Sequence, residues 1–347
     1  GTWKAKEYTG THGTNGFYLP MKPTTQADGF NTVLYTGNDT TLSVNGVGFE
    51  PDFVWIKCRS HGGSASFEHI LTDTVRGANK TLNSDNSNTE AANNATGYLS
   101  VFDSDGFTVT GGDATNGIGR TYAAWCWDAG SGSAASNTNG SITSTVKAND
   151  SYGFSIVSYT GNGTSGATIG HGLSSAPKMI IVKNRTTAGA DWPVYHEDTG
   201  NTGATYLNTT AAFATDSTRW NNTSPTSTVF SVGNGQGVNH SSASLIAYCF
   251  SEVSGYSKIG SYTGTGTTTG NVTTVGFRPA FLMVKGTSLT SEWVILDNTR
   301  DPNPDPAKNV LIPNRTNVDS TAAAGLYVKF TDTGFQPVGN GTDTNSS

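Results

Sequence analysis

The fold follows from a stretch that occurs three times, as PDFVWIK at 51–57, PKMIIVK at 177–183 and PAFLMVK at 279–285. In each copy a proline stands six residues before a lysine, and nearly every residue between them is apolar. A short apolar run bounded by a turn-forming residue is typical of a β-strand that is covered on both faces. Three copies in one chain predict three related structural units.

Two further motifs repeat around this stretch. One precedes each copy, as YTGN at 35–38, YTGN at 159–162 and YTGT at 262–265. The other follows the first two copies, as YAAWCWD at 122–128 and LIAYCFS at 245–251, and predicts a strand that closes each unit. Successive tyrosines of the YTG motif lie about 124 and 103 residues apart, so each unit has the size of a domain rather than of a solenoid turn.

The composition agrees with short strands and many turns. Only 13% of the 347 residues are charged, while glycine supplies 43 positions. Helix-forming residues are sparse, which argues against a helical bundle or a doubly wound α/β fold. The 7 Trp, 13 Tyr and 15 Phe are enough to build several cores, so disorder is excluded as well. We therefore expect an all-β protein of three tandem β-sandwich domains.

The repeats place the domain boundaries. They predict an N-terminal arm at 1–29, a first repeat at 30–129, a Ser/Gly/Asn-rich flexible linker at 130–150, a second repeat at 151–254 and a third at 255–347.

The third repeat lacks a closing strand, because the sequence given ends at Ser347, directly after the loop that precedes that strand in the first two units. A missing strand leaves an open sheet edge. Three explanations stay open: the chain continues beyond Ser347, the arm or another copy of the chain supplies the strand, or the edge is exposed.

Charge and cysteine usage exclude several classes of protein. The net charge is −6 and the 20 basic residues are scattered, which argues against nucleic-acid binding. No apolar run is long enough to span a membrane. The three cysteines, Cys58, Cys126 and Cys249, stand within apolar strands and do not form a disulfide pattern. We expect buried free thiols in a chain that folds in a reducing cytoplasm.

No catalytic or metal-binding signature is present in the sequence, so we predict no catalytic residues, no metal site and no cofactor. The pairs Asp73/Arg76 and Asp297/Arg300 recur at one spacing and predict loop-bracing ion pairs or Asx turns, with active-site carboxylates as the alternative. A Ca²⁺ loop is a weaker reading of the acidic stretches at 103–106 and 301–305, for which a Gly hairpin turn and a proline-stiffened connection are the alternatives.

Four aromatic residues of the second repeat form the one candidate binding site. Trp192, Tyr195, Tyr206 and Trp220 would provide a platform for stacking sugars if their rings were exposed. The alternative is that these rings belong to the core, where aromatic residues of β-strands are usually found.

The repeated motifs resemble those of a known group of proteins. The succession YTGNG, APKMIIVKNR, DWPVYH and AYCFSEVSGYSK at 159–258 resembles an uncharacterised tandem β-domain of structural and tail-fibre-like proteins of marine bacteriophages. The arm segment YTGTHGTNGFYLP at 8–20 is similar to a segment that precedes concanavalin-like sandwiches in such proteins. The resemblance implies a jelly-roll or concanavalin-like, lectin-type sandwich and carries no catalytic residues.

From this resemblance we expect a non-enzymatic virion protein: a tail fibre, spike or capsid decoration that is displayed on the particle surface. Its expected partners are other virion proteins, further copies of itself as a homotrimer, by analogy with fibres, and a host-surface glycan. One alternative is a phage-borne glycan depolymerase that uses Asp73, Asp297 or Asp301. Another is a bacterial surface adhesin or filament subunit assembled by strand donation.

Overall fold

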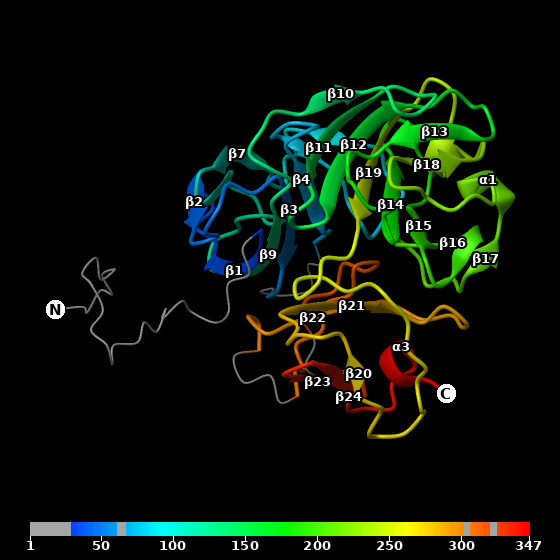
Figure 1. Cartoon of the computed structure of the whole chain (residues 1–347). Coiled ribbons are helices and arrows are strands. Elements are labelled where there is room, and N and C mark those ends of the chain that lie inside the picture. The colour runs from blue at the N-terminus through cyan, green and yellow to red at the C-terminus, as the bar shows by residue number, and fades with distance from the viewer. Residues whose placement is uncertain (1–28, 61–66, 302–305, 320–324) are drawn as a thin grey trace, which may run out of the picture.

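The protein is built from antiparallel β-sheets, as the computed structural model in Figure 1 shows. The structure describes residues 29–60, 67–301, 306–319 and 325–347, so the predicted arm lies outside it except for Gly29. The three helices in these ranges have four residues each. None of them is long and apolar enough to cross a membrane. The all-β prediction is confirmed.

Unit 1, the first repeat, pairs two main sheets around its own core. One has the strand order β1-β9-β3-β4 and the other β2-β8-β7, while β5 and β6 form a small separate ladder. The strands are β1 Phe30–Thr36, β2 Leu42–Asn45, β3 Phe53–Cys58, β4 Ile70–Asp73, β5 Lys80–Thr81, β6 Ala91–Ala92, β7 Leu99–Asp103, β8 Gly106–Val109 and β9 Thr121–Trp127.

Unit 2, the second repeat, has an eight-stranded sheet of order β10-β11-β12-β19-β14-β15-β16-β17 and a second sheet of β13 and β18. The strands are β10 Ala135–Asn137, β11 Ser144–Asn149, β12 Phe154–Thr160, β13 Ala167–Gly170, β14 Met179–Asn184, β15 Pro193–His196, β16 Gly200–Tyr206, β17 Ala214–Thr215, β18 Val229–Val232 and β19 Ser244–Phe250. The helices are α1 Ser217–Trp220, which Asp216 caps through Thr218 N, and α2 Gln236–Asn239.

Unit 3, the third repeat, has fewer paired strands. Within the part of unit 3 that the structure describes, β21 pairs only with β22, and β20-β24-β23 form the other sheet. The elements are β20 Thr273–Thr274, β21 Phe281–Lys285, β22 Trp293–Asp297, β23 Val328–Thr331, β24 Gly334–Pro337 and α3 Thr342–Asn345. In Figure 1 unit 3 lies beneath units 1 and 2.

The segment 130–150 is not the flexible linker that its composition suggested. It contains β10 and β11, which extend the large sheet of unit 2 through the pairing of β11 with β12. Ile142 and Val146 of this segment are buried in the core of unit 2. Small polar residues alternate here with a few apolar ones, and this alternation is enough to hold an edge strand on a sheet.

The YTG motif joins the start of each unit to its end. The hydroxyls of Tyr35, Tyr159 and Tyr262 each donate to the carbonyl before a buried asparagine. Those asparagines are Asn116, Asn239 and Asn345, and each Oδ1 accepts from the backbone N–H after the motif glycine at 2.9 Å. A Cβ on that glycine would lie 2.0–2.3 Å from a carbonyl oxygen of the facing loop. The close approach of two backbones therefore requires glycine.

The lysine that ends each repeated stretch is held by a loop of its own unit; Lys57 and Lys183 are fully buried, and Lys285 is partly buried. The ammonium groups of Lys57, Lys183 and Lys285 donate to the carbonyls of Phe67, Ala190 and Ser291 at 2.5–2.6 Å. Each of these carbonyls belongs to the residue two positions before His69, Trp192 or Trp293, which stand at matching positions in the three repeats. Burial lowers the pKa of all three lysines from 10.5 to about 8. The lysine thus closes the loop that links two neighbouring strands.

The acidic stretch at 103–106 forms a hairpin turn. It joins β7 to β8, and the matching stretch at 331–334 joins β23 to β24. A Cβ on Gly106 or Gly334 would lie 1.9 Å from the carbonyl oxygen of Val44 or Thr273 on the neighbouring strand. Asp105 accepts from the N–H groups of Gly46 and Gly48. The predicted Gly-dependent hairpin is therefore present at this stretch.

The three units are not independent, because a common core lies between them. This central core takes side chains from every unit, among them Phe53, Trp55, Trp125, Ile181, Tyr248, Trp293 and Ile295. The rings of Phe53 and Tyr248 stack across the boundary of units 1 and 2 with centroids 4.3 Å apart. Each unit also keeps a smaller core of its own. The units therefore form one body around shared apolar side chains.

We predict that Phe53→Ala destabilises the whole protein rather than unit 1 alone. Removal of this buried ring should lower the free energy of unfolding by about 3–5 kcal/mol. Differential scanning calorimetry should show one transition at lower Tm, with equal calorimetric and van't Hoff enthalpies. The control is Val101→Ala at a side chain that is 47% exposed, for which we expect a change within about 0.5 kcal/mol. Two or three separate transitions would contradict a shared core.

We also predict that the buried lysines make stability depend on alkaline pH. Between pH 8 and 10.5 the unfolded lysine is protonated and the folded one is not, so the unfolded state binds more protons and each lysine makes stability rise with pH. The buried thiols, whose pKa values are raised by burial, act in the opposite direction. A comparison of variants cancels their effect.

The measurement is urea unfolding of the wild-type chain and Lys57→Met at pH 7.5, 8.5 and 9.5. The stability of the wild-type chain relative to the variant should increase by up to about 1.4 kcal/mol per pH unit. Val101→Ala, which removes no titratable group, should give a difference that is constant with pH. Parallel curves for wild type and Lys57→Met would refute the assignment.

Candidate functional site

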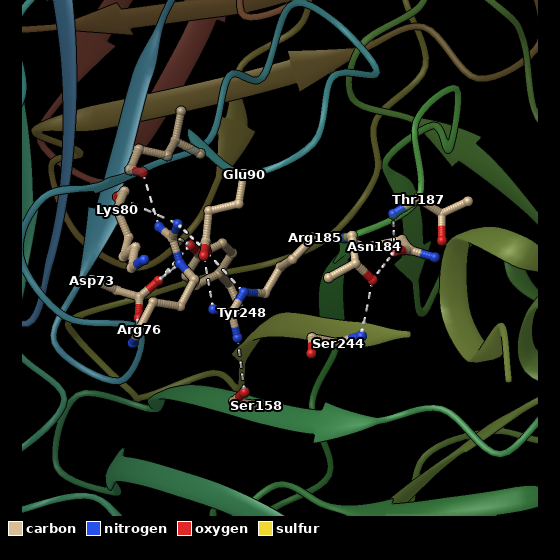
Figure 2. Close-up of polar contacts among 12 residues, drawn as sticks. Asp73, Arg76, Lys80, Glu90, Ser158, Asn184, Arg185, Thr187, Ser244 and Tyr248 are labelled. Carbon is tan, nitrogen blue, oxygen red and sulfur yellow. Dashed lines mark hydrogen bonds and ion pairs between the residues drawn. The ribbon is translucent and has the colours of Figure 1, made fainter. Parts of the chain in front are cut away.

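A network of buried charges joins unit 1 to unit 2. We call Asp73, Arg76, Glu90, Arg185 and Tyr248 the first junction cluster; Figure 2 shows Arg76 at its centre. Arg76 Nε lies 2.5 Å from Asp73 Oδ2, and Arg76 Nη1 lies 3.2 Å from Glu90 Oε2. Glu90 also receives Nε and Nη2 of Arg185 at 2.8 and 2.9 Å, a two-pronged ion pair between units. The Tyr248 hydroxyl donates to Asp73 Oδ2 at 2.8 Å.

The local turn places these groups. Asp73 ends β4, and its Oδ1 accepts the backbone N–H of Arg76 at 2.8 Å, so the chain turns back and brings the guanidinium over its own carboxylate. The side chains of Asp73 and Arg76 have no exposed surface. Burial alone would lower the pKa of Arg76, but the carboxylates of Asp73 and Glu90 raise it, so Arg76 is a cation. Burial raises the pKa of Tyr248 well above its ordinary value, so this hydroxyl keeps its proton.

The same network recurs between units 3 and 1. The second junction cluster consists of Asp297, Arg300, Asp319, Arg59 and Trp125. Arg300 Nε lies 2.6 Å from Asp297 Oδ2, and its Nη1 lies 2.7 Å from Asp319 Oδ1. Arg59 Nε lies 2.5 Å from Asp319 Oδ2, and Trp125 Nε1 donates to Asp297 Oδ2 at 3.0 Å. The predicted loop-bracing ion pairs and Asx turns are confirmed in both units.

At the third junction, between units 2 and 3, the positions that hold aspartate and arginine in the other two junctions hold a histidine and uncharged residues. Asp73 pairs with the first residue of β3, and Asp297 pairs with the first residue of β21. In unit 2 the residue that pairs with the first residue of β14 is His196, so His196 occupies the position of the two aspartates. Three residues later stands Thr199 in place of arginine. The backbone contact Glu90 N to Arg185 O has its counterpart in Phe213 N to Thr287 O, at 2.8 Å. The third junction (His196, Thr199, Phe213 and Thr287) thus lacks the ion-pair network of the other two.

A second set of contacts joins all three units in a cycle. Trp293 Nε1 of unit 3 donates to Tyr206 O of unit 2 at 2.9 Å, and Trp192 Nε1 of unit 2 donates to Asn86 O of unit 1 at 3.1 Å. His69 Nε2 of unit 1 lies 3.0 Å from Ile312 O of unit 3. These three donors occupy matching positions in their units, so the repeats are arranged as a closed ring of three.

His69 is neutral in this ring. Its Nδ1 accepts from Trp55 Nε1 at 2.8 Å, which leaves the proton on Nε2, where it faces the carbonyl of Ile312. Burial, and then the charge of Lys57, lower its pKa well below 6.5. His69 therefore has a structural role in the ring of three.

The four aromatic residues predicted as a sugar platform do not form one. Trp192 lies in the central core, while Tyr195 and Trp220 lie in the core of unit 2 with centroids 5.8 Å apart. Tyr206 is partly buried under the guanidinium of Arg219 at 5.5 Å. Stacking on a sugar needs an exposed ring face. The core alternative therefore holds for Trp192, Tyr195 and Trp220.

Other predicted chemistry is likewise used for structure. Cys58, Cys126 and Cys249 are buried free thiols, as expected, and burial raises the pKa of Cys249 to about 12. Asp301 accepts from the N–H groups of Lys308 and Asn309 at 2.5 and 2.7 Å and so holds a loop. Across the part of the chain that the structure describes, no three His, Cys, Asp or Glu side chains are grouped to hold a metal ion.

Sequence reasoning missed the outer partners of the clusters. Glu90, Asp319, Arg59 and Arg185 were not predicted, although both arginines stand two residues after a repeated lysine. That shared position was a usable signal. Glu90 and Asp319 stand in loops of different length, where the repeats cannot be aligned by their residues alone.

Comparison with known families agrees with a fold made of one body. A family model described as a domain of unknown function, DUF7483, matches residues 25–347. The chain belongs to this family. The match spans all three repeats. Searches of curated proteins and of solved structures found no match.

We predict that the junction clusters stabilise the ring. Asp73→Asn leaves the buried guanidinium of Arg76 without its nearest countercharge and should lower the free energy of unfolding by about 3–5 kcal/mol. Asp332→Asn removes a carboxylate that is 97% exposed and should change it by less than about 1 kcal/mol. Urea unfolding at pH 7 measures both. A loss below about 1 kcal/mol for Asp73→Asn would mean that the cluster contributes little.

Proposed function

We propose that this protein is a non-catalytic structural protein of a bacteriophage particle: a tail fibre, spike or capsid-surface element. One observation carries the proposal. The recurring carboxylates, Asp73 and Asp297, have no exposed surface and hold neighbouring units together through arginine and an aromatic side chain. Carboxylates that hold neighbouring units together make the protein a rigid body, and a protein displayed on a virion surface requires such rigidity.

We further propose that each unit is a β-sandwich of the jelly-roll or concanavalin-like type. In unit 1 the buried side chains of one core come from both sheets, with Val54 and Ile70 from one and Val44 and Phe107 from the other. Facing sheets with a common apolar layer are the defining feature of a sandwich. Sandwiches of this kind often serve as attachment modules, so host-surface or glycan attachment and a homotrimer are parts of the same proposal.

The depolymerase alternative gains no support from the residues suggested for it. Asp73 and Asp297 are out of reach of a polysaccharide, because their oxygens are enclosed by donors from the protein. Asp301 is partly exposed, yet both of its oxygens accept hydrogen bonds from Lys308 or Asn309. A glycosidase needs two accessible carboxylates on either side of one bond, and two of these three side chains, Asp73 and Asp297, have no exposed surface.

We expect the protein to be a component of purified phage particles. Density-gradient particles analysed by mass spectrometry and by immunogold labelling should contain it at a constant ratio to the capsid protein. Its absence from particles would refute the proposal.

Reducing-end assays with host polysaccharide test the alternative. The purified protein should release no more reducing ends than a heat-denatured sample. Release that is lost in Asp301→Asn, a variant that removes a loop carboxylate outside the junction clusters, would favour the depolymerase instead.

A further inference from the structure

A cavity of about 910 Å³ lies at the third junction. Residues 257–263 and β21 lie along it, together with aromatic side chains of units 1 and 2 such as Trp127 and Phe250. Within the described residues, β21 is hydrogen-bonded to β22 along one edge only. Four of its five side chains are partly exposed, whereas the whole of β3, its counterpart in unit 1, is buried. Figure 1 shows β21 at the side of unit 3 that faces the other two units.

In units 1 and 2 a strand occupies the matching place. β9 lies between β1 and β3, and β19 lies between β12 and β14, each antiparallel to both neighbours. The first residue of β1 and the first residue of β3 both pair with the seventh residue of β9, Trp127. Ser257 and Phe281 are the residues of unit 3 that correspond to these two. With the same register, both would pair with the seventh residue of the missing middle strand.

The junction contacts indicate the same missing strand. The fifth residue of the middle strand is Trp125 in unit 1 and Tyr248 in unit 2, and each donates to the aspartate of a neighbouring unit. The third aspartate position is taken by His196, which lines the cavity. β9 and β19 therefore each contact an aspartate position of a neighbouring unit. The equivalent contact to His196 would require a middle strand in unit 3.

We propose that the cavity is an acceptor site for one extended seven-residue strand, supplied in cis by polypeptide joined to Ser347 and antiparallel to both 257–263 and β21. The turn at Asn345 provides the direction. Asn116 and Asn239 make the same hydrogen bonds as Asn345, and β9 and β19 begin five residues after them. Ser346 and Ser347 line the same cavity, so a strand joined there enters it without a long loop.

The other sources fit less well. In residues 1–28 the longest apolar run is Phe17-Tyr18-Leu19, which Pro20 ends, and proline cannot donate in the middle of a sheet. A second copy of the chain already uses its own middle strands, β9 and β19, within its own sheets.

The environment defines the chemistry of the strand. In β9 and β19 the third and fifth residues face the central core, as Ala123 and Trp125 or Ile246 and Tyr248. The second, fourth and sixth residues face the core of their own unit, as in Leu245, Ala247 and Cys249. The acceptor site therefore selects a segment that is apolar on both faces, with a large side chain at position 2, a small one at position 4 and aromatic rings at positions 5 and 7.

The test extends the full chain. We would append Gly-Ser and then Ser-Leu-Ile-Ala-Tyr-Cys-Phe, the sequence of β19, so that the strand begins five residues after Asn345. The control tail carries proline in place of the alanine at position 4. With the first tail, amides of β21 should exchange with solvent roughly tenfold or more slowly than in the control, and Tm should rise by several degrees.

Met283→Glu provides a second readout, because Met283 pairs in register with position 5 of the strand. Met283→Glu should abolish the gain in Tm and in amide protection of the tailed protein. It should change the Tm of the untailed protein much less, since Met283 is partly exposed there.

Equal exchange and equal Tm for the two tails would overturn the proposal. So would protection of β21 in the untailed protein that disappears on deletion of residues 1–28, which would identify the arm as donor, or on dilution, which would identify a second copy. The outcome does not depend on whether the protein belongs to a virion.

Discussion

The packing of three sheets against one set of aromatic and aliphatic side chains is the constraint on which the rest of the structure depends. In units 1 and 2 the third and fifth side chains of the middle strand face the central core, and the second, fourth and sixth fill the core of the unit itself. A middle strand buried on both faces must be apolar throughout, and this explains why β9 and β19 are the least polar stretches in a chain otherwise rich in Gly, Ser, Thr and Asn.

The junction clusters add specificity to this packing. Apolar contact is not directional, so shared burial alone would allow units to meet in several orientations. The ion pairs of Arg76 and Arg300 are fully buried, and a buried charge that loses its partner is strongly destabilising. Each cluster therefore fixes the order and orientation of two units. The third junction has a backbone contact between Phe213 and Thr287 instead, and it is the junction that contains the cavity.

Local sequence patterns predicted the three units. They did not predict the clusters between the units, because those clusters join residues that are far apart in the sequence. The repeated apolar stretches made the strand content predictable, the apolar neighbours of the cysteines predicted buried thiols, and the recurring Asp/Arg spacing predicted the ion-paired turns. Composition misled at 130–150, where Ile142 and Val146 were the only sign of a strand, and at Trp192, because aromatic content does not distinguish a core from a binding surface. Arg185 and Glu90 are 95 residues apart, and Tyr248 and Asp73 are 175, so no local window could join them.

The position of β9 has a consequence for how the protein is made. β1 begins at Phe30, but its partner in the sheet ends at Trp127, so the first sheet stays without its middle strand until the whole unit has left the ribosome. At ordinary elongation rates this takes roughly 5–20 s. During that time β1 and β3 each have an unpaired edge, as β21 has within the residues that the structure describes. Synthesis therefore passes through the same open form once for each repeat, and the sheet edges of the nascent chain are the segments that a chaperone would have to shield.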